Sequence, residues 1–494
     1  MLRCVISYDL TVEELAKHLQ ESIVFECMKK RFLVCLIVAV VTCPLWSQQL
    51  LLSFSEAEAH MLASNEMLKV AEAGVSIAKY EQGKTRAWWW PQLQAHGVYA
   101  HLSEQVEVRQ PLSWFTAPAK AYVQNILPSE TFITGLLDKV GEYTLTFPLL
   151  PQDITSIGLT AEWVAFSGGK RLYADRIARR LVDVAEVNRQ KVTAAEQILL
   201  VERYYGLVLS RQTEAVCRER YEGLQRHYKD ALRLEEVGVI DKATRLFAQV
   251  NMEEAAREWQ HAKNVERTAQ NALKQMLGMD GDTLQIVPSS PLHIDSHLPS
   301  ELTFMAAMCS ANPTLNILYL EERMTRDKFR IDQSAYLPDI ALFGKQTLYA
   351  HGLPSNLSPR TVVGVGFTWN LFDGLERERQ LAQTRLAQQS LAWSREETED
   401  ELGVAVSDLY ATLLQSRDEA EVLGSNIALG EELLRMRRIA FAEGMATSAE
   451  VIDAENTLSA TKLARLAAYY AYDVALVNLL ALCGITNEFG DYIQ

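Results

Sequence analysis

The sequence predicts a mainly α-helical fold with a small β portion, arranged as two structural repeats of long antiparallel coiled-coil helices with two β-strands each. The first observation is a repeat: residues 166–250 recur 206 positions later, so that Gly238 corresponds to Gly444. The second is that proline is absent from residues 152–287 and 360–494, which permits helices far longer than the usual length of about 11–12 residues. The third is that a run of alternating apolar residues precedes each long helical segment, as in a β-strand.

The balance of charge and apolar residues excludes some classes of protein. The chain has 494 residues and a formal net charge of −15. A nucleic-acid-binding protein needs a basic surface, so we expect no DNA or RNA partner. Hydrophobic residues make up 48% of the chain, yet no uninterrupted run of about 18 or more apolar residues is present to cross a bilayer as a helix. If the protein enters a membrane, we expect it to do so as β-strands.

Residues 28–47 have the pattern of a secretory signal peptide. Three basic residues follow Met28, residues 32–41 are apolar, and cleavage is expected near Ser47. We interpret residues 1–27 as an upstream misassignment, because they contain four glutamates (Glu13, Glu14, Glu21 and Glu26) where a signal peptide would be basic. Lipidation of Cys43 is an alternative, although Thr42 fits poorly into a small-residue cleavage site.

The first repeat (48–279) is expected to begin with a helix that runs to about Arg86 from a cap at Ser53 or Ser55. Two strands are predicted at about 91–101 and 155–166, joined by a long loop, 102–153, whose five prolines argue against a long helix. A long helix should then extend to Val237. It should turn at Gly238 and return as a second helix to about Leu277.

Residues 280–300 are expected to form a linker, because they contain Pro288, Pro291 and Pro299. His293, Asp295 and His297 have the spacing of metal ligands on a helix, but the prolines favour a solvated loop. Three cysteines lie far apart in helical patterns: Cys217, Cys309 and Cys483. We expect them to be small apolar core residues without disulfides.

The second repeat (301–485) restarts the pattern, and residues 486–494 form a tail. Its strands are predicted at about 338–349 and 361–372. A coiled-coil seam follows steps of four and three through the second long helix: Leu402, Val406, Leu409, Leu413, Ser416, Ala420, Leu423, Ile427, Gly430 and Leu434. Such a spacing predicts packing against a neighbouring helix with left-handed supercoiling.

The strands have a length suited to crossing an outer membrane, since about 9–11 tilted residues suffice. A four-stranded open sheet would leave backbone groups unpaired in lipid, so further copies of the chain must close it. Three copies would give twelve strands, an even number that is usual in bacterial barrels. Trp88, Trp89 and Trp90 precede the first strand and would suit an aromatic belt at the membrane surface, or alternatively a buried aromatic cluster beneath the strands.

Over about residues 50–485 the chain resembles the TolC-like outer membrane efflux proteins. The resemblance lies in the unit helix–strand–strand–helix–turn–helix given twice, in Leu337-Pro338 before a strand, in Leu371-Phe372-Asp373-Gly374 at the strand-to-helix corner, and in Glu443-Gly444 at the turn. It implies a homotrimer with a 12-strand β-barrel in the outer membrane lipid and a long α-helical tunnel in the periplasm. It further implies docking to a periplasmic adaptor and an inner-membrane pump, in tripartite efflux or type I secretion.

The resemblance also implies roles for individual residues. The helix turns at Gly238 and Gly444 would dock the adaptor, and Glu450 and Asp453 would form an acidic ring at the periplasmic gate, with Phe441 as an aromatic latch. Two departures bear on the gate. The first-repeat equivalents of the two acids are Thr244 and Phe247, and Ala446 stands where some family members have an arginine that holds the gate shut.

Two other classes of function compete with a channel. A secreted coiled-coil scaffold or adhesin would explain the helices and the signal peptide, but not the four alternating segments at matched places in two repeats. An enzyme is not expected. The sequence contains no glycine-rich phosphate loop, no His/Cys metal cluster and no nucleophile motif, and it implies no cofactor.

Overall fold

The computed structural model describes residues 48–126, 131–279, 284–295, 297–352 and 359–492. The predicted signal peptide (28–47), the segment 1–27 and Cys43 lie outside the described residues. The chain divides into two compact units. The first contains the described residues up to Ser64 with Glu202–Leu292 and Leu423–Tyr470, and the second contains Asn65–Val201, His293–Val422 and the residues from Ala471 onwards.

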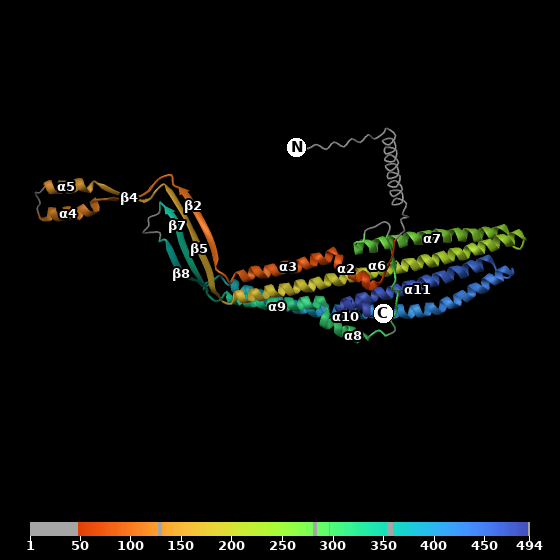
Figure 1. The fold of residues 1–494 in the computed structure, drawn as a ribbon. Helices are drawn as coiled ribbons and strands as arrows, with labels where there is room; N and C mark the ends of the chain where they lie inside the picture. Colours follow the sequence, from red (N-terminus) through yellow and green to blue (C-terminus); the bar gives the residue numbers. More distant parts are fainter. Residues whose placement is uncertain (1–47, 127–130, 280–283, 296, 353–358, 493–494) are drawn as a thin grey trace, which may run out of the picture. The chain divides into compact units, whose positions relative to one another are not determined.

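The long helices reproduce the repeat in the sequence. Helices α6 (Lys170–Glu236) and α10 (Glu376–Ala442) have 67 residues each, and the returning helices α7 (Lys242–Leu277) and α11 (Ser448–Cys483) have 36 each (Figure 1). A helix of 67 residues is about 100 Å long. Among the described residues, only α11 is long and apolar enough to cross a membrane by length and composition, and half of its most apolar window is buried, as in a core helix.

The predicted coiled-coil seam on α10 is confirmed by burial. Val406, Leu413, Ser416, Ala420 and Leu434 are all buried, and the other members of the seam are half-buried. Gly430, a small member of the seam, affects the distance between α10 and α11. A Cβ built there would lie 3.3 Å from Leu458 Cδ1 of α11, so glycine permits the close approach of the two helices.

Each short helix is broken in two, where the sequence predicted one continuous helix. The four segments are α2 (Phe54–Ser64), α3 (Glu66–Ala87), α8 (Glu301–Ala311) and α9 (Pro313–Ser334). Asn65 and Asn312 stand at the breaks, and each side chain accepts hydrogen bonds from two backbone N–H groups of the helix that follows. An asparagine that caps a new helix start is a stable break, because it satisfies donors that would otherwise be unpaired.

The predicted strands form one antiparallel sheet. Its order is β2 (Gln92–His101), β5 (Asp153–Ser167), β7 (Asp339–His351) and β8 (Thr361–Thr368). The last strand ends at Thr368, four residues earlier than predicted, because its partner strand begins at Asp339 and offers no backbone groups beyond that pair. Within the described residues, β2 and β8 are the two edges of the sheet.

The register gives this sheet two different faces. Apolar side chains share one face: Leu93, Ala161, Trp163, Leu342, Val363, Val365 and Phe367. The other face carries the polar side chains Gln92, Gln94, Thr160, Glu162 and Lys345. A few apolar residues, such as Phe343, also lie on it. Most of the apolar face is exposed. An exposed apolar face opposite a polar one is the pattern of a strand that separates lipid from water.

The segment 102–153 is not the irregular loop that the prolines suggested. It contains a hairpin of β3 (Val106–Pro111) and β4 (Thr144–Leu150), which leads to the helices α4 (Ser113–Ile126) and α5 (Thr131–Gly141). Pro118 lies inside α4. A single proline removes one backbone donor, and this short surface helix tolerates the loss.

The predicted linker also contains regular structure. Residues Leu284–Pro288 form β6, which pairs in parallel with β1 (Gln48–Leu52). Tyr204 of α6 holds this sheet, since its hydroxyl donates to Leu52 O (2.8 Å) and accepts from Ser290 N (3.1 Å). The tail begins with a 3-10 turn (Thr486–Glu488) and α12 (Phe489–Tyr492), which buries Phe489.

The cysteines fit the prediction only in part. Cys483 is buried and its thiol donates to Phe304 O (3.3 Å), and Cys217 is half-buried. Cys309 is exposed on α8, with its sulfur 3.8 Å from Glu399 Oε1, so it is not a core residue. All three are free thiols.

An arginine closes each strand-to-helix corner in the same way. Arg171 donates to Trp88 O (2.7 Å) and to Val164 O, and its guanidinium lies 4.9 Å from the centre of the Trp89 ring. At the equivalent positions in the second repeat, Arg377 donates to Ala335 O (3.3 Å) and to Asn370 O (2.8 Å) and lies 4.7 Å from the centre of the Tyr336 ring. Each arginine therefore ties the end of a short helix to the end of a strand.

We predict that Arg171→Ala destabilises the protein by about 1–3 kcal/mol, because it leaves two carbonyl groups without their donor. Denaturant unfolding in detergent, followed by circular dichroism, would measure the loss. The matched control is Arg176→Ala, which removes an exposed arginine whose contact is the Tyr173 ring at 5.3 Å. Equal effects of the two substitutions would show that the corner contacts contribute nothing.

Candidate functional site at the helix turns

The two helix turns are built alike. Gly238 and Gly444 have φ values of +76° and +72°, in the left-handed region that glycine adopts without steric cost. After each glycine, the next N–H bonds back across the turn: Val239 N donates to Leu234 O and Met445 N to Ala440 O, both at 2.8 Å. This Schellman-type pattern satisfies carbonyls at the end of each long helix and reverses the chain.

The helices that follow the turns are capped differently. In the first repeat, Asp241 accepts a hydrogen bond from Thr244 N (2.9 Å). In the second repeat, Thr447 and Glu450 form a capping box: Thr447 N donates to Glu450 Oε2 (2.7 Å), and Glu450 N donates to Thr447 Oγ1 (3.4 Å). Only the second repeat therefore begins its returning helix with a glutamate in this position.

Glu450 has a charged partner as well as the capping box. Its Oε1 lies 2.9 Å from Arg437 Nη1. The hydrogen bonds from Thr447 lower the pKa of this carboxyl, with a smaller contribution from Arg437. Asp453, one helical turn further on, is exposed. The two acids thus lie on one side of α11, as their i, i+3 spacing predicted.

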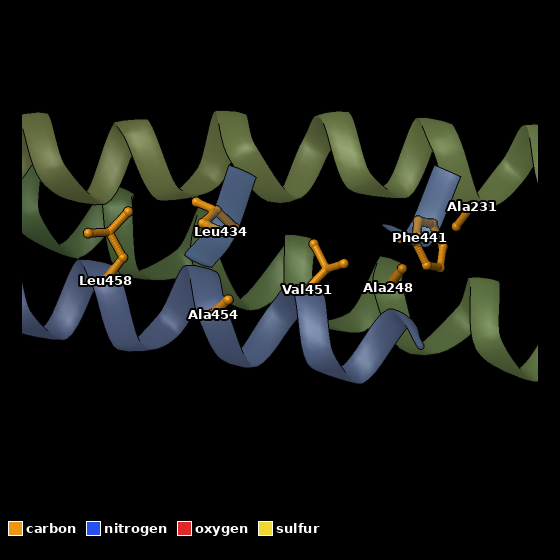
Figure 2. Close-up of a cluster of buried hydrophobic side chains, with 7 residues drawn as sticks. All are labelled: Ala231, Ala248, Leu434, Phe441, Val451, Ala454 and Leu458. Atoms are coloured by element: carbon orange, nitrogen blue, oxygen red, sulfur yellow. The ribbon is translucent and has the colours of Figure 1, made fainter. Parts of the chain in front are cut away.

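The two turns lie side by side. A Cβ built on Gly444 would be 3.8 Å from Val239 Cγ1 of the other turn. Between the turns is a cavity of about 610 Å³, whose lining includes Ile240, Phe247, Phe441 and Ala446. Beneath it, apolar side chains from all four helix segments pack together: Ala231, Ala248, Leu434, Phe441, Val451, Ala454 and Leu458 (Figure 2).

Phe441 is a core residue of this cluster, with 3% of its surface exposed. Its ring lies 4.6 Å from the ring of His227 on α6. His227 Nε2 is in turn 2.7 Å from Ser448 Oγ, at the start of α11. Sequence reasoning missed His227, because a single histidine in a helical pattern gives no signal; only its neighbours across the fold give it a role.

Polar pairs also link the helices at this level, both within the second repeat and between the two repeats. Arg438 Nη2 donates to Glu455 Oε2 (2.5 Å), and burial raises the pKa of the Glu455 carboxyl despite this partner. Gly223 of α6 makes room for the pair, since a Cβ there would lie 2.2 Å from Glu455 Oε1. Lys462 of α11 pairs with Glu219 of α6 (3.1 Å) and with Glu431 of α10 (3.2 Å).

The remaining predicted site residues lie elsewhere in the fold. Trp88, Trp89 and Trp90 are exposed by 50%, 46% and 74%, so they are not buried in a single copy of the chain. Among the residues that the structure describes, no group of three His, Cys, Asp or Glu side chains could hold a metal ion. In the segment of the histidines, Asp295 Oδ1 accepts from His297 N (2.8 Å), a bond within a loop.

Comparisons with known proteins agree with this fold. Residues 308–485 match the family model described as outer membrane efflux protein. The structure of CusC, described for its transmembrane channel formation, is 17% identical, with a TM-score of 0.69 over 87% of this chain and 92% of CusC. The outer membrane protein VceC of Vibrio cholerae is 14% identical, with a TM-score of 0.67 over 87% of this chain and 96% of VceC.

A third structure is the open state of the MtrE outer membrane channel of Neisseria gonorrhoeae. It is 16% identical, with a TM-score of 0.65 over 88% of this chain and 89% of MtrE. Comparison with curated proteins gives no match. Similarity at these identities shows a shared fold, and the predicted fold class of two helical repeats with a small β portion is confirmed.

We predict that acid destabilises the contact between the repeats through His227. Burial, with a smaller contribution from Arg438, lowers the pKa of His227 from 6.5 to about 4. Between these values the unfolded chain binds the proton more readily, so stability should fall by about 2 kcal/mol from pH 7 to pH 5. Denaturant unfolding at both pH values would measure the loss.

The control for this prediction is His227→Gln, which retains a hydrogen-bonding group beside Ser448 but does not titrate. The variant should lose less stability on acidification than the wild type. An acid sensitivity that is the same in both proteins would assign the effect to other groups. Glu455 does not produce it, because a raised carboxyl pKa has the opposite sign.

Proposed function

We propose that this protein is the outer membrane channel of a tripartite efflux or type I secretion system, because residues 308–485 match the outer membrane efflux protein model and the described chain shares its fold with CusC and VceC. In this role it is a passive conduit across the outer membrane and the periplasm. The observation that carries the proposal is the four-stranded sheet, which has an apolar face, a more polar face and two open edges, on helices of about 100 Å.

The open edges are the reason to propose a homotrimer. In lipid, the backbone groups of β2 and β8 need partners, and a neighbouring copy can supply them. Three copies give a closed 12-strand barrel whose apolar face meets the lipid and whose polar face lines the lumen. A secreted coiled-coil scaffold would have no use for such a sheet. A passive channel needs no catalytic group or cofactor, and we propose that the protein is not an enzyme.

The same proposal assigns the domains. Residues 28–47 direct export, residues 48–279 and 301–485 are the two efflux repeats on either side of the 280–300 segment, and the helices extend into the periplasm. Trp88, Trp89 and Trp90 are exposed where the first strand begins, which suits an aromatic belt at the inner surface of the outer membrane. The partners at the other end are a periplasmic adaptor and, through it, an inner-membrane pump.

At the helix turns we propose the gate and the docking site. Three copies of Glu450 and Asp453 would form two rings of carboxylates that attract cations. Phe441 is a buried packing residue in one copy, so its contribution to the gate is to hold the turn of the second repeat on α6. Gly238 and Gly444 present bare backbone at the surface, where a partner can approach closely.

The proposed channel and its acidic ring predict a specific conductance result. Purified trimers in planar bilayers should give discrete current steps with a preference for cations. In Glu450→Gln/Asp453→Asn this preference should fall several-fold, because six carboxylates leave the pore entrance while glutamine preserves the capping box. Glu443→Gln is the control, since it removes an exposed charge on the other side of the turn.

The outcomes of this experiment separate the two claims. If the double variant gives current steps with an unchanged preference for cations, the channel is supported and the acidic ring is rejected. No steps from a folded, heat-resistant trimer would reject the channel itself.

We predict that Gly238→Ala weakens adaptor binding about tenfold or more. A Cβ there meets no atom of the chain within 4 Å, so it would point into the space that a partner occupies. The control is Gly278→Ala, because Gly278 also has a positive φ (+64°) but caps the far end of α7. The substitution at either position imposes similar backbone strain. Surface-bound trimers titrated with the adaptor would give the affinities, and equal effects would reject docking at the turn.

A further inference from the structure

The insertion between β2 and β5 has no core of its own. In its described residues, 102–126 and 131–153, no apolar side chain is buried, and Thr116 is the one buried residue. Large apolar side chains are exposed along its strands and helices: Val106, Val108, Trp114, Phe115, Tyr122, Ile126, Phe132, Ile133, Leu136, Val140, Tyr143, Leu145, Phe147 and Leu149. An exposed apolar surface of this kind marks an interaction site.

Elements of this size are not stable by themselves. Helices α4 and α5 have 14 and 11 residues, and isolated helices shorter than about 12–15 residues are marginal in water. The hairpin of β3 and β4 has two strands, which is too few for independent stability. One ion pair joins the helices, between Lys120 Nζ and Asp138 Oδ1 (2.5 Å). Their packing must therefore be completed by another surface.

The bilayer is a poor candidate for that surface. Strands β2 and β5 have 10 and 15 residues, and about 9–11 residues already cross an outer membrane. The insertion therefore begins where the chain has left the lipid. Helices that lie on a membrane carry many Lys and Arg residues on their polar face. Helices α4 and α5 contain two lysines, Lys120 and Lys139, and the first is paired with Asp138.

A second copy of this chain fits better. The insertion leaves the sheet from β2, which is an edge strand, and returns through β5, at the end of the sheet opposite the long helices (Figure 1). In a closed trimer, β2 of one copy pairs with β8 of the next. Three identical apolar insertions would then stand around one opening, close to the contacts between copies, and cyclic symmetry would bring the same surfaces together.

We propose that the α4–α5 segments of three copies pack against one another through their exposed apolar side chains and form a cap that restricts the outer mouth of the barrel. This inference rests on the proposed function, because it requires the closed trimer. The cap buries side chains such as Phe115, Phe132 and Leu136, and it completes the core that a single insertion lacks.

Photo-cross-linking tests the packing between copies. Benzoylphenylalanine in place of Phe132, which is 79% exposed in one copy, should give covalent dimers and trimers of the chain when trimers in membranes are irradiated. The yield should fall at least several-fold when Phe115→Ser and Leu136→Ser are added. Cross-links to lipid alone, or none from an intact trimer, would overturn the proposal.

Conductance tests the restriction. Phe115→Ser/Phe132→Ser/Leu136→Ser should raise single-channel conductance several-fold, provided that heat-resistant trimers are retained. The matched control is Gln124→Ser/Asn125→Ser/Thr131→Ser, three exposed polar residues of the same insertion, and it should behave as the wild type. Equal single-channel conductance in the wild type and both triple variants would reject the cap but would still support the channel. No steps in any of them would instead reject the channel.

Discussion

In the proposed channel, backbone hydrogen bonding in lipid is the constraint on which the rest of the structure depends. A strand inside a bilayer cannot leave its N–H and C=O groups unpaired, and the described sheet ends in two open edges. Whatever closes the sheet also positions the helices, because Arg171 and Arg377 tie each strand-to-helix corner to the end of a short helix. In the proposed trimer, the same two corners would therefore couple the closure of the barrel to the arrangement of the helices.

Much of this fold could be predicted from the sequence, because it repeats. The long helices follow from two proline-free segments, and the turns from glycines at equal spacing. What could not be predicted lies in contacts between distant residues. The pairing of Gln48–Leu52 with Leu284–Pro288 joins two five-residue strands across the whole first repeat. The breaks at Asn65 and Asn312 depend on side-chain bonds that an amphipathic pattern does not contain.

In the candidate site too, local features could be predicted from the sequence and contacts between distant residues could not. Glycine turns and the spacing of Glu450 and Asp453 are local, and the sequence contains them. His227 and Lys462 contact residues more than two hundred positions away in the chain, and Arg438 contacts a residue on the other side of the helix turn. No regular spacing in the sequence predicts these contacts. Ala446 occupies the position at which the resemblance would allow an arginine, and in this chain Arg437 and Arg438 of the preceding helix pair with Glu450 and Glu455. Both glutamates are therefore ion-paired, and their arginine partners lie on α10.

The capping box at Thr447 gives Glu450 two tasks at once. One carboxylate oxygen holds the start of α11 through Thr447 N, and the other faces Arg437. In the proposed channel, an adaptor that shifts Thr447 on docking would also shift the Glu450 carboxylate at the pore entrance, since a hydrogen bond joins the two residues. By reciprocity, ions that gather at this carboxylate would change the affinity for the adaptor by the same free energy. Under the proposed function, cation selectivity and adaptor binding are coupled through Thr447, and a substitution at this residue should alter both.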